Sequence, residues 1–145
     1  MFSRILIALV AVFSLAGCGS VPLADKAQDA AIKTFAAKPD VAGVYVYRDQ
    51  SVGAIAQHDV EVDGNLIGRT GAHTFLYKEI APGKHTVTSK AENSDSIQFD
   101  AVAGQLYFFW QEVQLGFIYG RTKLHLVGAE AGRLAVLECT LAESK

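Results

Sequence analysis

The feature that most constrains this fold is a series of short alternating segments separated by turn residues. From Val41 onward, apolar and polar side chains alternate, and clusters of Gly, Pro, Asn or Asp interrupt the alternation at intervals of about eight to twelve residues. A period of two places successive side chains on opposite faces of a strand. Strands at this spacing are typical of all-β sandwiches and barrels, so the sequence predicts a mainly β fold.

Eight segments carry this alternation and are predicted to be strands. They are Ala42–Tyr47, Ile55–Val62, Leu66–Arg69, Thr74–Ile80, His85–Lys90, Ile97–Val102, Leu106–Val113 and Thr122–Val127. The seventh segment holds successive aromatic residues from Tyr107 to Trp110, so both of its faces are bulky. We expect it to be a central strand with a layer on each side, which favours an antiparallel sandwich over a barrel.

Glycine and proline mark the expected turns. Asp63-Gly64 predicts a type I′ hairpin, because that turn needs positive φ angles that glycine adopts freely. Gly68 interrupts the next strand and predicts a bulge or a close approach of another backbone. Ala81-Pro82-Gly83-Lys84 predicts a further turn.

Two helices are expected outside the strands. The first covers residues 23–38, with its helical pattern running from Leu23 to Phe35 and Pro39 ending it. Its docking face is predicted to carry Leu23, Ala27, Ala31 and Phe35, and its solvated face Asp25, Lys26, Gln28, Asp29 and Lys33. The segment Glu130–Cys139 favours a short helix over a final strand, with Leu134, Leu137 and Leu141 on one side.

The start of the chain has the layout of a secretory signal. Arg4 is followed by an apolar run, Ile5–Leu15, and then by small residues. This run is too short to span a bilayer, which needs ~20 apolar residues. The stretch Leu15-Ala16-Gly17-Cys18 resembles the lipobox of bacterial lipoproteins. An ordinary signal peptide with a chance cysteine beside the cut is the alternative.

The lipobox resemblance implies a definite processing scheme. Residues 1–17 would be removed, and Cys18 would become an N-palmitoyl and S-diacylglycerol cysteine that anchors the protein to a membrane, with residues 18–22 as a tether. Gly19 follows Cys18, where an aspartate would resemble an inner-membrane retention signal. The outer membrane is therefore favoured if the source is a Gram-negative bacterium.

Charge and cysteine content exclude some classes of function. Without Arg4, twelve basic residues stand against fifteen acidic ones, and no basic cluster is present, which argues against a nucleic-acid partner. If Cys18 carries lipid, Cys139 is the remaining thiol and no internal disulfide can form. Cys139 is expected to be a small buried apolar residue.

Two stretches resemble the repeat unit of PEGA-type domains, which are extracytoplasmic β-sandwich modules compared with transthyretin-like folds. They are Val60–Gly68, with Asp-Gly and a second glycine, and Ile80–Val87, with a Pro-Gly-x-His turn. With the lipobox, Val44–Arg48 and Ala103–Phe108, the chain resembles a family of bacterial lipoproteins grouped as a domain of unknown function. This resemblance implies a PEGA-like sandwich over residues 41–145.

No known catalytic constellation emerges from the sequence. The histidines are scattered without metal-ligand spacing, at His58, His73, His85 and His125. His85 is expected to bond backbone carbonyls at its turn. We therefore expect a module that acts by contact, without a cofactor or metal, on an envelope protein, a cell-wall polymer or the lipid plane. An envelope hydrolase or metal-binding enzyme that uses these histidines is the alternative, and a pocket joining His85 or His125 to a carboxylate would favour it.

The segment Gln114–Gly120 predicts a loop with large apolar side chains that are hard to bury. Phe117 and Tyr119 are the candidate partner contacts if the loop is exposed. The loop can equally fold back as a lid over the sandwich, and the lid is narrowly preferred.

Overall fold

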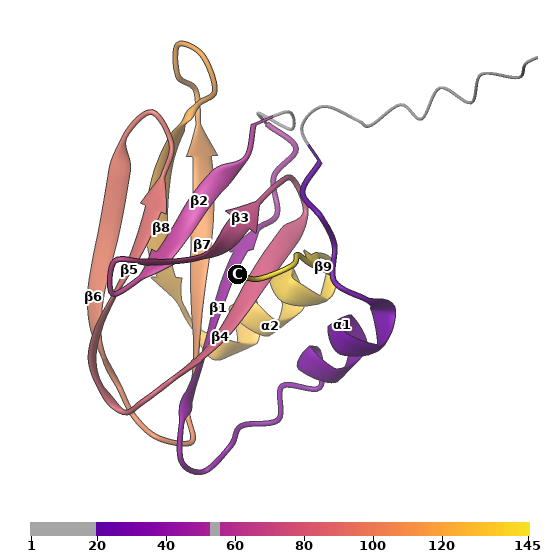
Figure 1. The fold of residues 1–145 in the computed structure, drawn as a ribbon, viewed down its shortest axis with the longest axis vertical. Helices are drawn as coiled ribbons and strands as arrows, with labels where there is room; N and C mark the ends of the chain where they lie inside the picture. The colour runs from indigo at the N-terminus through magenta and orange to yellow at the C-terminus, as the bar shows by residue number, and fades with distance from the viewer. Residues whose placement is uncertain (1–19, 53–55) are drawn as a thin grey trace, which may run out of the picture.

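The computed structural model describes residues 20–52 and 56–145 and shows two β-sheets with two helices (Figure 1). Its elements in chain order are α1 (Lys26–Ile32), β1 (Ala42–Arg48), β2 (His58–Val62), β3 (Asn65–Thr70), β4 (Thr74–Ile80), β5 (Gly83–Lys90), β6 (Ser94–Ala101), β7 (Leu106–Gln114), β8 (Arg121–Val127), α2 (Ala129–Leu137) and β9 (Thr140–Leu141). The predicted mainly β class is confirmed. The leader, Cys18 and Ile55 lie outside the described residues.

The two sheets form a sandwich-like pair of layers. One sheet has the order β8-β7-β1-β4-β9, and the other has the order β3-β2-β5-β6. Most neighbours are antiparallel, but β1 runs parallel to β7, and β4 runs parallel to β9. The parallel pairing inserts β1 between β4 and a strand that lies far along the chain. The predicted central strand β7 is therefore an interior strand beside β1, and β1 holds the middle of the sheet.

The first core fills the space between the two sheets. Val44 and Val46 of β1 meet Val60 and Val87 of the facing sheet, with Phe109 of β7 beside them. All five side chains are fully buried. Burial of each such side chain contributes ~1.5–3 kcal/mol, so this layer supplies much of the drive to fold.

A second core lies on the other face of the five-stranded sheet, under the helices. The alternate residues of β1 point here, and Tyr45 stacks on Phe108 of β7 with ring centroids 4.7 Å apart. Val136 of α2 closes the layer. Because β1 contributes side chains to both cores, all seven of its residues are buried, as the apolar residues on both of its faces predicted.

Helix α1 is shorter than the predicted 23–38, and of the four predicted docking residues only Phe35, which follows the helix, packs on the second core. Asp25 caps its start by accepting from the Gln28 N–H at 2.7 Å, and Phe35 leaves the helix with φ 53°. The predicted docking residues Ala27 and Ala31 are exposed. Asp29, predicted on the solvated face, instead accepts a hydrogen bond from the Leu141 N–H at 2.7 Å, because this backbone donor otherwise lacks a strand partner.

Helix α2 confirms the predicted C-terminal helix but not its predicted face. Leu134 and Leu137 are exposed, whereas Gly132 and Val136 are buried. A β-carbon on Gly132 would lie 2.3 Å from Cγ of Phe108, so the helix approaches β7 more closely than any larger residue allows. Backbone proximity, and not leucine content, selects the buried face here.

Two of the turn predictions are confirmed, and the third holds only in part. Gly83 and Lys84 of the predicted turn Ala81–Lys84 already belong to β5, and this connection carries the chain from one sheet to the other. Asp63 and Gly64 have φ angles of 52° and 79°, which is the positive pair of a type I′ turn. The β2–β3 register shifts beside Gly68, and Gly68 also bridges to Ser144. Both roles suggested for Gly68, a bulge and a close backbone approach, therefore occur together.

Candidate functional site: an apolar hairpin tip

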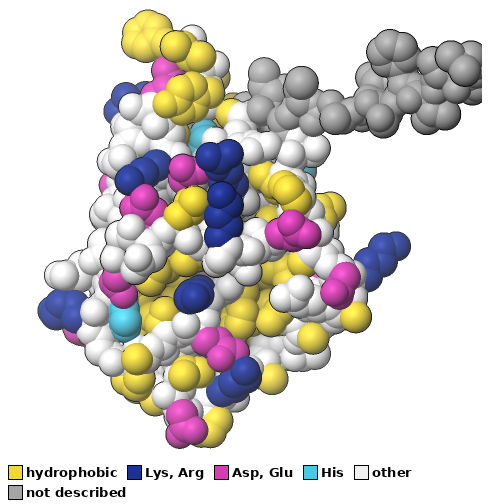
Figure 2. Space-filling model, viewed as in Figure 1, with side chains coloured by type: hydrophobic (Ala, Val, Ile, Leu, Met, Phe, Trp, Pro, Cys, Tyr) yellow, Lys and Arg dark blue, Asp and Glu magenta, His cyan; other side chains and the backbone are white. Residues whose placement is uncertain are grey.

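The loop between β7 and β8, residues 115–120, projects from one end of the molecule and ends in apolar side chains. Leu115 and Ile118 are 87% and 85% exposed, Phe117 is fully exposed, and Tyr119 is 45% exposed. We call these four residues the apolar tip. In the space-filling view, hydrophobic side chains gather at the uppermost point of the molecule, where this loop lies (Figures 1 and 2). The preferred prediction, that this loop folds back as a lid over the sandwich, is therefore wrong.

The backbone of the apolar tip is held by Glu92, which lies in the neighbouring turn between β5 and β6. One carboxylate oxygen, Oε1, accepts the N–H groups of Phe117 and Ile118 at 3.0 and 3.1 Å. The Glu92 N–H in turn donates to the Gly120 carbonyl at 3.1 Å. Gly116 lies directly against this carboxylate, where a β-carbon would come within 1.8 Å of Oε2. The side chains of the tip are thus exposed, while Glu92 holds three backbone groups of the loop.

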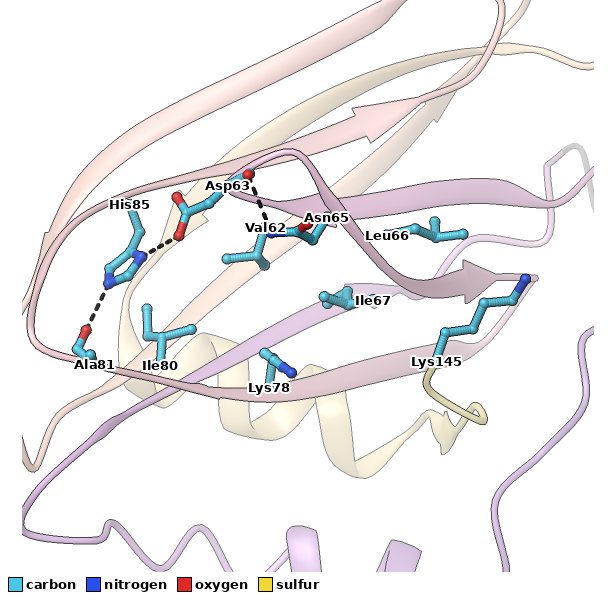
Figure 3. Close-up of a pocket in the computed structure, with 10 residues that line it drawn as sticks. All are labelled: Val62, Asp63, Asn65, Leu66, Ile67, Lys78, Ile80, Ala81, His85 and Lys145. Atoms are coloured by element: carbon cyan, nitrogen blue, oxygen red, sulfur yellow. Dashed lines mark hydrogen bonds and ion pairs between the residues drawn. The ribbon is translucent and has the colours of Figure 1, made fainter.

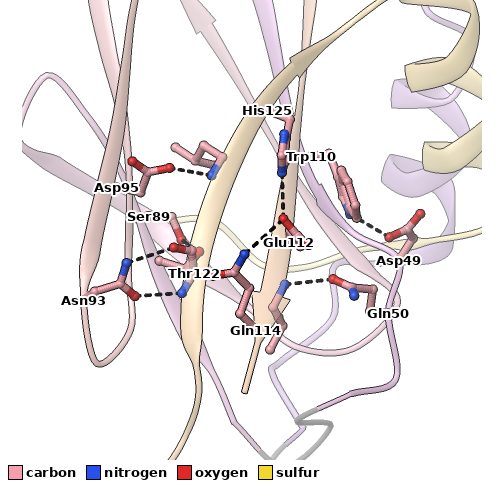
Figure 4. Close-up of polar contacts among 12 residues, drawn as sticks. Asp49, Gln50, Ser89, Asn93, Asp95, Trp110, Glu112, Gln114, Thr122 and His125 are labelled. Carbon is pink, nitrogen blue, oxygen red and sulfur yellow. Dashed lines mark hydrogen bonds and ion pairs between the residues drawn. The ribbon is translucent and has the colours of Figure 1, made fainter. Parts of the chain in front are cut away.

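Two further residues of the same region tie β8 to the β5–β6 hairpin. The Asn93 side chain accepts from the Thr122 N–H at 2.8 Å and donates to the Thr122 carbonyl at 2.9 Å. Asp95 accepts from the Leu124 N–H at 2.8 Å (Figure 4). Side chains that replace backbone partners in this way join the two hairpins without a continuous strand ladder. They fix the base from which the apolar tip projects.

His58 supports the tip from inside. Its ring is fully buried, and its Nε2 lies 3.2 Å from the Tyr119 carbonyl. Because a carbonyl only accepts, Nε2 carries the proton. Desolvation by burial lowers the pKa of His58, which keeps the ring neutral. The preceding residue, Gln57, donates from Nε2 to the Ser20 carbonyl at 2.9 Å, so the first described residue lies at this end of the molecule.

A buried polar layer lies beneath the tip, at the same end of the sandwich. Gln111 of β7 donates to the Ser89 hydroxyl at 2.6 Å and accepts from the Thr70 hydroxyl. Ser89 also bonds the Thr122 hydroxyl at 2.6 Å (Figure 4). Arg48 is fully buried and donates to the Ala56 carbonyl at 2.6 Å. Buried polar groups are tolerated because they find partners, and this cross-linking stiffens the end that carries the tip.

The four histidines of the enzymatic alternative do not come together. His58 serves the tip, and His73 pairs with the Ser51 hydroxyl at 2.8 Å on an exposed turn. His125 contacts a carboxylate oxygen of Glu112 at 2.8 Å and stacks on Trp110. Within residues 20–52 and 56–145, no three His, Cys, Asp or Glu side chains are placed to hold a metal ion.

His85 lies at the rim of an open groove of about 430 Å³ (Figure 3). Its Nδ1 lies 2.5 Å from Asp63 Oδ2, and its Nε2 lies 2.7 Å from the Ala81 carbonyl, as expected for a turn histidine. Both partners accept hydrogen bonds, so these contacts favour the doubly protonated ring. Accordingly, the hydrogen bond to Asp63 raises the pKa of His85, and the same bond lowers the pKa of Asp63.

The groove does join His85 to a carboxylate, the feature expected to favour an enzyme, but the geometry of the ring is unsuited to catalysis. A histidine that acts as a general base needs a free ring nitrogen directed at substrate, and both nitrogens of His85 are engaged. The other lining residues include Ile67, Ile80, Lys78 and Lys145, which offer an apolar floor and two cations but no nucleophile beside the ring. The His85–Asp63 pair is best explained as a clasp between the β2–β3 turn and β5.

Cys139 is 2% exposed, as expected for a small core residue, and its thiol donates to the Arg48 carbonyl at 3.7 Å. Desolvation by burial raises the pKa of this thiol to about 12, so it stays protonated at neutral pH. No helix in the part of the chain that the structure describes is long and apolar enough to cross a membrane.

The functional residues that sequence reasoning missed are Glu92, Asn93 and Arg48. Glu92 and Asn93 stand in an ordinary-looking turn, and nothing local indicates that they bind the next hairpin along the chain. Gly116, beside two bulky apolar residues in the loop, is the one signal that a close contact is needed there.

Fold and site together define a two-layered, mainly β protein with an exposed apolar cluster at one end. Residues 38–121 match the family model described as "Protein of unknown function (DUF2846)", and the chain belongs to this family. A Haemophilus influenzae relative described as "Uncharacterized protein" is 30% identical over 146 residues, which cover 99% of this chain and 86% of the relative. No solved structure matches the chain. The resemblance to PEGA-type domains therefore stays a prediction.

Proposed function

We propose that this protein is a lipid-anchored envelope lipoprotein whose domain acts by contact, with the apolar tip as its working surface. The anchor is the lipid expected on Cys18, and the outer membrane is its favoured location. The observation that carries the proposal is the combination of exposed apolar side chains with a loop backbone that is held at Phe117, Ile118 and Tyr119 by hydrogen bonds from the neighbouring elements. A cluster that is apolar, exposed and preorganised is typical of an interaction site.

Preorganisation distinguishes this tip from an ordinary mobile loop. The Glu92 carboxylate and the His58 ring bind the second half of the β7–β8 loop, and the Asn93 amide binds Thr122 at the start of β8. Ordering a loop costs conformational entropy, and a tip ordered before binding does not lose that free energy on contact. The contact partner is an envelope protein, a cell-wall polymer or the lipid plane itself.

A hydrolase is the second candidate, and the histidine environments count against it. Both ring nitrogens of His85 are hydrogen-bonded. The exposed Ser51–His73 pair does not line the groove that contains His85. The histidine substitutions His73→Gln, His85→Gln and His125→Gln are accordingly expected to leave contact at the tip intact.

The test uses site-specific photo-crosslinking in intact cells, with radiolabelled palmitate to follow the anchor. A photo-reactive phenylalanine analogue replaces Phe117, and in a matched control it replaces Val102, which is also an exposed apolar residue but precedes β7 at its other end. We expect palmitate in the wild type but not in Cys18→Ser, and crosslinked products from position 117 but not from position 102. Equal labelling of wild type and Cys18→Ser refutes the anchor, and equal crosslinking at both positions refutes the contact surface.

A further inference from the structure

The start of the domain and the apolar tip are joined by a short chain of contacts. Ser20 accepts from the Gln57 side chain, the adjacent His58 bonds the Tyr119 carbonyl, and Tyr119 belongs to the tip. In Figure 1 the first described residues and the β7–β8 loop both lie in the upper part of the view. Cys18 precedes Ser20 by two residues, a reach of about 7 Å for extended chain. A lipid on Cys18 would therefore hold this end of the domain against the bilayer.

We propose that the apolar tip inserts into the same lipid surface that holds the acyl chains of Cys18, as a second, non-covalent membrane contact. This inference rests on the proposed lipid anchor. The occupant is the lipid interface because a tether this short leaves little room between the tip and the membrane. Each exposed side chain of the tip would then exchange water for the boundary between headgroups and acyl chains.

The chemistry of the tip suits this interface. Leu115, Phe117 and Ile118 supply apolar surface, and Tyr119 combines an aromatic ring with a hydroxyl, a type of residue that is enriched at membrane interfaces. Arg121 is exposed directly after the loop, where a long cationic side chain can reach anionic headgroups. Interfacial segments of this kind enter the boundary by ~5–10 Å, which suits a hairpin tip.

Part of the tip backbone is already hydrogen-bonded within the protein, which reduces the cost of bringing the tip to the lipid interface. An unpaired N–H or carbonyl in hydrocarbon costs several kcal/mol, so loops normally avoid lipid. Here the N–H groups of Phe117 and Ile118 are bonded by Glu92, and the Tyr119 carbonyl is bonded by His58. The bonds come from residues behind the tip, so they can persist while its side chains enter lipid.

The experiment places an environment-sensitive NBD dye at the tip of the full lipidated protein. Phe117→Cys carries the dye in the test variant and Val102→Cys in the control, whose parent residue is 57% exposed at the other end of β7. Labelling is selective because the Cys18 sulfur would be consumed by the lipid thioether and Cys139 is buried. Both proteins are reconstituted into vesicles of phosphatidylethanolamine and phosphatidylglycerol, with or without shallow spin-labelled lipids.

We expect a blue shift and a several-fold rise in emission for the dye at position 117, with strong quenching by the spin-labelled lipids. The dye at position 102 should keep its water-like emission. If both dyes stay in water while the protein floats with the vesicles and carries palmitate, the insertion is refuted and the anchor stands. Absence of palmitate from the wild type refutes the proposed anchor instead. Crosslinking of position 117 in cells to a protein, and not to lipid, also overturns the insertion in favour of a protein partner.

Discussion

Removing the Glu92 carboxylate should loosen the apolar tip while leaving the rest of the fold intact. Oε1 of Glu92 accepts two backbone N–H groups, and each hydrogen bond to a charged acceptor contributes ~1.5–3 kcal/mol. Water can replace the carboxylate once it is gone, because the tip is exposed, so we take the loss for both bonds together as ~2 kcal/mol. At about 1.4 kcal/mol per factor of ten, this lowers the protection of both amides by roughly 30-fold.

Amide hydrogen exchange, resolved by residue, measures this effect. In Glu92→Ala, the Phe117 and Ile118 amides should exchange roughly 30-fold faster than in the wild type, while the core amides of β1 and β7 change little. Glu92→Gln keeps a neutral acceptor and should give a smaller increase. Glu138→Ala removes an exposed carboxylate far along the chain and serves as the control. Unchanged exchange at both tip amides in Glu92→Ala would refute the idea that Glu92 orders the tip.

Three further predictions concern stability. The pKa of His85 is raised, so its contribution to the free energy of unfolding is complete below the unfolded pKa near 6.5 and is lost as pH rises through the folded pKa. The pKa of Asp63 is lowered, so its contribution is complete above the unfolded pKa near 3.8 and is lost as pH falls through the folded pKa. A pH series of melting curves should therefore show the clasp stabilising most between these values, and His85→Gln should flatten that dependence; parallel curves would contradict it. Gly64→Val should lower the free energy of unfolding by ~1 kcal/mol or more, since φ is 79° there, and denaturant titration that finds no change would mean the turn adapts. Gly132→Ala gains ~1 kcal/mol of helix propensity, but its methyl group crowds Phe108 at a cost of ~1–3 kcal/mol, so the Tm of this variant should fall. As a control, Gly128→Ser lies in open space at the N-cap of α2 and should keep or raise the Tm.

The local chemistry of the chain was sufficient to predict strands β1 to β8 and the hairpin at Asp63-Gly64, but not the short strand β9. Val44 and Val46 alternate with Tyr45 and Tyr47, and this pattern indicated a strand buried on both faces, as β1 is. Asp63-Gly64 indicated a hairpin because positive φ is a property of the residues themselves. These signals are readable because period and turn preference act over a few neighbouring residues.

Helix faces were decided by the tertiary structure. Both sides of α2 carry apolar residues, and the leucines suggested that their side is buried. The close approach of the helix to Phe108 instead buries the side with Gly132 and Val136. In α1 an unpaired strand N–H at Leu141 drew in Asp29, which the sequence pattern had placed in water. Periodicity measures how apolar a face is, and it does not report the distance to the neighbouring backbone or its unmet hydrogen bonds.

The candidate site divides in the same way. The sequence by itself determined that residues 114–120 form a loop with greasy side chains, and it identified Phe117 and Tyr119 as candidate contacts. Only the tertiary structure decided that the loop projects outward, because the parallel pairing of β1 with β7 and the clamp by Glu92 come from segments distant in the chain. Hydrogen bonds between hairpins leave no periodic signature in the sequence, so a lid and an exposed tip are equivalent until the fold brings Glu92 beside Gly116.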